Sequence, residues 1–395
     1  MRMTVAVLMG ALAFSAAAEI PWNLPELFKA PKMYDAPQYA TNNVKACFFE
    51  SVPYKGKPTR VFAFYGFPTN RTGKVPAIVL VHGGGGSAFY KWVELWNSRG
   101  YAAISMDTCG AVSNHTGGGK HPRHEWGGPG GWGGFDQIND PIGDQWSYHA
   151  VAAVIKAHSL LLSFPEVDTA KTGITGISWG GYLTCIAGSL DDRFKFAVPV
   201  YGCGFLGENG NSTWRARIIK MGADGQKWFS LWDPSSYLPL AKSPFLWVTG
   251  SNDFAYPMDA LQKSYHALKV PYTLCVRLRM PHGHGGAGEN PEEIRTFADS
   301  FFRDGVPLVT VSKPKRTGNI AEVKVMDCLP FTAELNYTTD TGVWQKREWK
   351  SLPAEVNVAA GTVKAELPAD TAVYYFNIKQ SDKLVVSSEH EEIRK

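Results

Sequence analysis

The stretch Gly176-Ile177-Ser178-Trp179-Gly180-Gly181 determines how we interpret the rest of this 395-residue chain. Before it, Thr172-Gly173-Ile174-Thr175 has the β-branched character of a short strand, and after it Tyr182–Ala187 is typical of the start of a buried helix. Small residues two positions before and after Ser178 allow a tight turn between strand and helix. Such a turn holds the serine side chain exposed, near the unpaired N–H groups of the helix N-terminus. The stretch therefore predicts a reactive serine whose partners lie elsewhere in the chain.

Apolar runs on both sides of this turn predict a parallel sheet. The run Val75–Val81 is almost continuously apolar and ends in His82-Gly83-Gly84-Gly85-Gly86, as expected for a strand buried on both faces. A helix over 88–99 and a strand over 101–106 follow it, and this alternation implies right-handed crossovers. Two strands are expected earlier, over 44–50 and 59–67, and three further strands later, over 194–201, 245–249 and 272–280. Further helices are expected over 145–162, 258–268 and 291–303. We predict an α/β catalytic domain over 19–306 with a mostly parallel, doubly wound sheet.

The first residues differ from the rest of the chain. Met1-Arg2-Met3 supplies a positive charge, Val5–Phe14 an apolar centre, and Ala16-Ala17-Ala18 a small-residue cleavage site. This pattern predicts a signal peptide over 1–18 and a secreted or periplasmic mature protein. The apolar run is too short to span a bilayer, so we expect no membrane span.

The character of the sequence changes again after residue 306. Short alternating runs separated by turn residues replace the helix–strand alternation, which predicts a small all-β, sandwich-like domain over 307–395. No pairing of a nucleophile with a base is visible there, so its expected role is packing or contact with substrate.

The composition excludes some partners. Hydrophobic residues make up 44% of the chain and aromatic residues 13%, which is enough for a large core. The net charge of +4 is small for this length and gives no reason to expect nucleic acid. The oligomeric state is left open.

A long segment over 107–144 is dense in glycine, tryptophan and histidine. Long connections without regular structure are usually lids or binding loops, so we expect this one to cover the site. His115, His121 and His124 have no acidic or cysteine partner at ligand spacing, and we therefore predict no metal. For Trp126 and Trp132 two roles stay open, stacking on sugar rings or anchoring the loop, and Trp126 is taken as a candidate to bind substrate.

A serine nucleophile needs a base to take its proton and an acid to orient the base. Ser178, Asp253 and His284 follow one another in a known order for such triads, Ser then Asp then His. Each stands just beyond the end of a predicted strand, and the carboxyl ends of parallel strands form one edge of the sheet. We therefore predict these three as the catalytic residues.

His282 is a second candidate for the catalytic base. We favour His284 because it lies between glycines, which leave room for its ring, whereas His282 follows a proline and is expected to support the site or contact substrate. Asp191, Asp192 and Asp233 are less suitable acids than Asp253 because they do not close an apolar strand.

Backbone N–H groups are expected to stabilise the negative oxygen that forms during attack by the serine. One is the N–H of Trp179, directly after the serine, and the other comes from the glycine loop, where we choose Gly84. Glycines there allow a ligand to approach the backbone without meeting Cβ atoms.

The glycine loop, the serine stretch, Gly250-Ser251-Asn252-Asp253 and Pro281-His282-Gly283-His284-Gly285 together resemble bacterial dienelactone-hydrolase-like and acetylxylan-esterase-like α/β-hydrolases. These are related to prolyl-oligopeptidase-type catalytic domains. The resemblance covers about 44–305, and the C-terminal part resembles the small β-sandwich appended to some secreted hydrolases. It implies the α/β-hydrolase fold and a serine esterase that removes acetyl or similar groups from plant or algal polysaccharide. The nucleophile is serine rather than the cysteine of true dienelactone hydrolases, so lactone hydrolysis is not implied.

The expected activity is the hydrolysis of carboxylic esters through a Ser-His-Asp acyl-enzyme, with no metal or cofactor. The expected substrate is an acylated carbohydrate, such as acetylated xylan, or another small ester. Two alternatives stay open: a serine peptidase of the prolyl-oligopeptidase-like type, and a non-catalytic protein that binds glycans.

Overall fold

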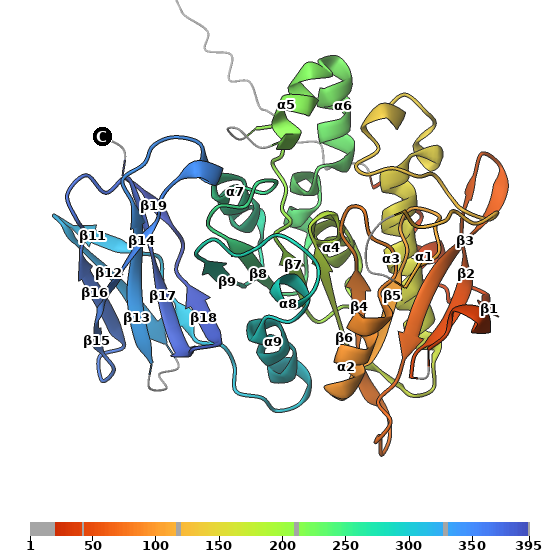
Figure 1. Ribbon diagram of the computed structural model, residues 1–395, viewed down its shortest axis with the longest axis horizontal. Coiled ribbons are helices and arrows are strands. Elements are labelled where there is room, and N and C mark those ends of the chain that lie inside the picture. The colour runs from red at the N-terminus through yellow and green to blue at the C-terminus, as the bar shows by residue number, and fades with distance from the viewer. Residues whose placement is uncertain (1–19, 42, 116–119, 209–212, 327–330, 394–395) are drawn as a thin grey trace, which may run out of the picture.

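A computed structural model describes residues 20–393 except 42, 116–119, 209–212 and 327–330 (Figure 1). The predicted signal peptide over 1–18 lies outside the described residues. Among the residues described, no helix combines the length and apolar character needed to cross a membrane.

Six parallel strands form the centre of the main sheet, in the order β5-β4-β6-β7-β8-β9. Their bounds are β4 Val75–Val81, β5 Ala102–Met106, β6 Val167–Ile177, β7 Ala197–Val200, β8 Phe245–Gly250 and β9 Tyr272–Arg277. Beside β5 the sheet continues through the antiparallel strands β3 (Lys57–Gly66), β2 (Lys45–Tyr54) and β1 (Met33–Asp35). The predicted doubly wound, mostly parallel central sheet is confirmed.

Helices cover both faces of this sheet (Figure 1). In β4, Ala77, Val79 and Val81 pack in the same apolar cluster as residues of α3 and α4. The alternate residues Ile78 and Leu80 pack in the cluster that contains residues of α2 and α9. A strand buried on both faces is apolar at every position, which is the pattern of this run. The helices are α1 (Leu24–Leu27), α2 (Tyr90–Ser98), α3 (Trp146–Ser163), α4 (Trp179–Leu190), α5 (Thr213–Lys220), α6 (Ala223–Trp232), α7 (Met258–Ala267), α8 (Gly286–Glu289) and α9 (Glu292–Phe302).

The C-terminal strands do not stand apart from the main sheet. Strand β18 pairs antiparallel with β9 through Ser387 and Leu274, so that β18-β17-β13-β14 extends the main sheet at that end. A second sheet, β10-β12-β16-β15, contributes residues to the apolar cluster that also contains residues of α2 and α9. The strands are β10 (Thr310–Val311), β11 (Lys315–Thr317), β12 (Ile320–Met326), β13 (Thr332–Thr338), β14 (Lys350–Pro353), β15 (Glu355–Asn357), β16 (Thr362–Glu366), β17 (Val373–Ser381), β18 (Leu384–Ser387) and β19 (Glu391–Glu392).

A buried polar network joins α3 to the end of α4. His158 Nδ1 lies 2.7 Å from Asp191 Oδ2, and Arg193 donates to both oxygens of Asp191. Burial raises the pKa of Asp191, but the contacts with His158 and Arg193 outweigh it and hold this pKa at about 2. The carboxylate is therefore ionised and paired. Asp191 thus has a structural role.

Replacing Asp191 by Asn is expected to destabilise the fold by about 3–5 kcal/mol, because Arg193 and His158 then lose their charged acceptor. Because the folded-state pKa is depressed, this stabilisation is present above the ordinary value of 3.8 and is lost as the pH falls towards 2. Denaturant unfolding at pH 7 measures the effect. The exposed neighbour Asp192, changed to Asn, is the control. Equal stabilities of the two variants would contradict this account.

Candidate active site

Ser178 lies at the tight turn that the sequence predicts. Strand β6 ends at Ile177, α4 begins at Trp179, and Ser178 between them has φ +58° and ψ −118°. A positive φ is strained for a residue with a side chain and persists only where the surroundings enforce it. Any Cβ at Gly176 would lie 2.2 Å from the Gly180 carbonyl oxygen, and one at Gly180 would lie 2.0 Å from that of Val81. Glycine is therefore required on both sides of the serine.

Ser178, His282 and Asp253 form a continuous chain of contacts. The Nε2 atom of His282 lies 2.8 Å from Ser178 Oγ, and its Nδ1 atom lies 2.6 Å from Asp253 Oδ2. The other oxygen of Asp253 accepts the N–H groups of Ala255 and Tyr256 at 2.9 and 2.8 Å. These bonds fix the carboxylate, which is 3% exposed. The three side chains thus have the mutual geometry of a nucleophile, a base and an orienting acid.

The prediction that His284 contacts Ser178 and Asp253 is wrong. His284 Nε2 accepts the N–H of Gly83 at 3.0 Å, and its Nδ1 lies 3.1 Å from Glu289 Oε1. The physical reason is local: α8 brings the carboxylate of Glu289 beside His284, while Asp253 already contacts the neighbouring histidine. His282, which we expected to support the site or touch substrate, holds the position between serine and acid.

The glycine loop after β4 lies against the serine. A Cβ at Gly83 would be 3.1 Å from Ser178 Cβ, and one at Gly84 would be 2.9 Å from Cδ1 of Trp179. Within the described part of the chain, the N–H groups of Gly84 and Trp179 donate to no protein acceptor. Among the described residues, no protein acceptor therefore competes for either of the two amides that the sequence predicts for the oxyanion.

His82, which opens this loop, is a buried and neutral support. Burial lowers its pKa to about 4, against the opposing effect of Asp107. Its Nδ1 lies 2.9 Å from the carbonyl oxygen of Gly83, and its Nε2 accepts the N–H of Thr108 at 3.1 Å. Both ring nitrogens are thus used to hold the backbone.

A cavity of about 590 Å³ opens above the serine. Its lining combines the glycine loop, Ser178, two histidines and three aromatic residues, as follows: Gly83, Gly84, Gly85, Gly86, Ile177, Ser178, Trp179, Trp214, Phe254, Ala255, His282, Gly283 and His284. Trp214 was not predicted from the sequence, and it lies on helix α5, which was not predicted either. Phe254 was not predicted, although this residue directly follows Asp253 and is 53% exposed.

Trp126, predicted to stack on substrate, is absent from the lining of this cavity. Its ring lies 4.3 Å from the guanidinium of Arg60 and packs against Phe48 and His124. That aromatic neighbourhood anchors the segment to β2 and β3. Another residue of the segment, Trp132, approaches the site instead. The centroid of its ring lies 5.6 Å from that of the His82 ring.

The three histidines of this segment do not come together around a metal. His115 packs against Phe64 and Tyr90, whereas His124 packs against Phe48. Across the part of the chain that the structure describes, no group of three or more ligating side chains is arranged for a metal ion.

Comparison with known proteins shows that the chain is similar to acetyl xylan esterases. The family model for acetyl xylan esterase (AXE1) matches residues 29–224. The acetyl xylan esterase of Paenibacillus sp. R4 superposes with a TM-score of 0.53 at 20% identity, covering 70% of this chain and 92% of that one. Acetyl xylan esterase 1 of Thermoanaerobacterium sp. JW/SL YS485 gives 0.54 at 16% identity, covering 71% and 95%. These structures support the α/β-hydrolase fold. The predicted resemblance is confirmed, as is the predicted class, a serine carboxylic ester hydrolase.

Proposed function

We propose that this enzyme hydrolyses carboxylic esters through an acyl-enzyme on Ser178, with His282 as the base and Asp253 as the orienting acid. The observation that carries the proposal is the unbroken chain of contacts from Ser178 Oγ through His282 to Asp253, at 2.8 and 2.6 Å. Ser178, at one end of this series of contacts, lines an open cavity through which an ester can reach it.

In the first step Ser178 Oγ attacks the ester carbonyl carbon, and its proton passes to His282 Nε2. The tetrahedral intermediate then collapses, and His282 returns the proton to the departing alcohol. Water attacks the acyl-enzyme, again with His282 as base, and the carboxylic acid leaves. Asp253 holds the ring orientation and stabilises the imidazolium in both steps.

The amides of Gly84 and Trp179 serve as the oxyanion hole in this proposal. Both lie beside Ser178, and neither has another acceptor within the described residues. The Trp179 amide opens helix α4, so the positive end of the helix dipole adds to the stabilisation.

The proposed substrate is an acetylated polysaccharide of the acetylxylan type. The match to the acetyl xylan esterase family supports this choice. We further propose export by way of the signal peptide over 1–18, and a C-terminal all-β domain over 307–395 that packs against a catalytic domain over 19–306.

An ester panel tests the proposed specificity. We expect p-nitrophenyl acetate and acetylated xylan to be hydrolysed well, and kcat/KM to fall by more than about tenfold for long acyl chains or bulky aromatic acids, as for an enzyme selective for small acyl groups. Release of acetate from xylan is the decisive readout. Preference for long or aromatic acids would contradict the deacetylase assignment, and turnover of aminoacyl peptides without acetate release would favour the peptidase.

A further inference from the structure

A second histidine–carboxylate pair lies beside the proposed catalytic one. His284 Nε2 accepts the N–H of Gly83, while its Nδ1 lies 3.1 Å from Glu289 Oε1. The same carboxylate oxygen accepts the N–H of Gly285 at 2.9 Å. The pair connects α8 to the glycine loop, and the proposed reaction uses neither side chain to transfer a proton.

These contacts determine the tautomer of His284. A backbone N–H can only donate, so Nε2 is the unprotonated nitrogen, and Nδ1 carries the hydrogen that it donates to Glu289. The ring is held between this bond and the ring of Phe89, whose centroid lies 4.4 Å away. Glu289 therefore keeps His284 in the one neutral form that can accept from Gly83.

Gly83 is tied on both sides of its Cα atom. His284 holds its N–H, while its carbonyl oxygen accepts the N–H of Gly86 at 3.2 Å and lies beside His82 Nδ1. Because a trans peptide is planar, the N–H of Gly84 points away from that carbonyl oxygen. Glycine has unusually free dihedral angles, so both flanking peptides must be held to give the Gly84 N–H one direction.

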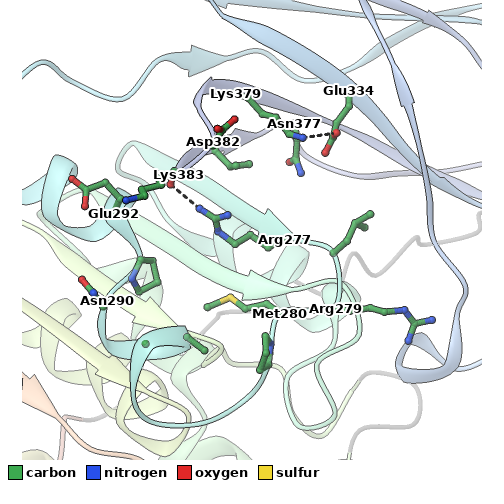
Figure 2. A pocket seen from close by; sticks show the side chains of 16 residues that line it. Arg277, Arg279, Met280, Asn290, Glu292, Glu334, Asn377, Lys379, Asp382 and Lys383 are labelled. Carbon is green, nitrogen blue, oxygen red and sulfur yellow. Dashed lines mark hydrogen bonds and ion pairs between the residues drawn. The ribbon is translucent and has the colours of Figure 1, made fainter.

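Packing alone does not hold the segment that bears His284. A Cβ placed at Gly283, Gly285 or Gly286 would meet no atom within 4 Å. Gly286 of this segment also borders a separate cavity of about 650 Å³, which is lined by Met280 and Asn290 among others (Figure 2). Because there is open space beside these glycines, specific hydrogen bonds are needed to hold the segment in one position.

We propose that His284 and Glu289 are a positioning pair that orients the glycine loop and thereby aims the Gly84 N–H at the oxyanion. The proposal rests on the proposed function, because it needs an oxyanion to form at Ser178. Neither residue contacts the reacting atoms in it. Their contribution is to fix the peptide that precedes Gly83, while the Gly83 carbonyl oxygen is held by Gly86 and His82.

The test compares His284→Ala with His284→Gln. Removing the acceptor is expected to lower kcat on p-nitrophenyl acetate by about 10- to 100-fold with little change in KM, as for a weakened oxyanion donor. The Gln side chain offers an amide oxygen near the position of Nε2, so His284→Gln should recover at least about tenfold of that loss. Glu289→Ala should lower kcat in the same direction.

Glu292→Ala supplies the matched control, since Glu292 is another carboxylate near α8 and pairs with Arg295 rather than with the loop. Melting temperatures separate folding defects from positioning. Full kcat in a folded His284→Ala variant would overturn the proposal, as would a Gln variant no better than Ala at equal stability. A wild-type enzyme with no esterase activity would instead refute the proposed function.

Discussion

Replacing Ser178 by Ala is expected to lower kcat/KM for ester hydrolysis by about 10⁴- to 10⁶-fold, the range typical of a lost serine nucleophile. No other hydroxyl can take its place, because only Ser178 Oγ lies at His282 Nε2 among the described contacts. Steady-state kinetics with p-nitrophenyl acetate measure the loss.

Ser230→Ala is the matched control for this experiment. Ser230 is exposed on α6, and within the described part of the chain its hydroxyl donates to the Gln226 carbonyl of the same helix and to nothing else. We expect unchanged kinetics for it. If Ser178→Ala kept more than about a hundredth of the wild-type rate at equal stability, the acyl-enzyme would have to form elsewhere.

Replacing His282 by Ala is expected to cost nearly as much as loss of the serine, about 10⁴- to 10⁶-fold in kcat/KM. The serine then has no base, and the carboxylate of Asp253 has no ring to orient. Because the two residues act as a unit, the double variant with Ser178→Ala should be no worse than either single variant.

The comparison with His284→Ala makes this prediction specific. His284 contacts the glycine loop and not Ser178. The loss of kcat/KM in His284→Ala should therefore be much smaller than the loss in His282→Ala. An active His282→Ala enzyme together with an inactive His284→Ala enzyme would contradict the geometry and restore the assignment made from sequence.

Much of the fold was predictable because its signals are local. The run that became β4 is apolar throughout, and the glycines around Ser178 are required by contacts of 2.0 and 2.2 Å. Asp253 was predictable because it lies just beyond Gly250, the end of the buried strand β8, at the edge where the serine also lies. Strand ends converge at one sheet edge whatever the details of packing.

The choice between the two histidines depended on the partner carboxylates. Both rings reach the same corner, since His284 contacts Gly83 and Gly83 lies against Ser178. Flanking glycines leave room for the His284 ring, but they do not determine which way that ring points. Glu289, on the helix that follows His284, was the available signal, because a nearby carboxylate competes for a histidine.

Other parts depended on contacts between distant segments. Helix α5 carries Trp214 to the cavity, yet its 8 residues are too few to show a clear helical periodicity. Trp126 lies far in sequence from Arg60, the cation that its ring contacts. The continuation of the main sheet into the C-terminal strands rests on the pairing of β18 with β9, which no local pattern predicts.

The most direct test of the central claim is mass-spectrometric mapping of the enzyme after labelling with a fluorophosphonate. This reagent reacts with an activated serine, so we expect one adduct per chain, on the peptide that contains Ser178, with loss of esterase activity in proportion. The adduct should be absent from the His282→Ala variant. Labelling of another residue, or full activity with Ser178 unmodified, would contradict the account.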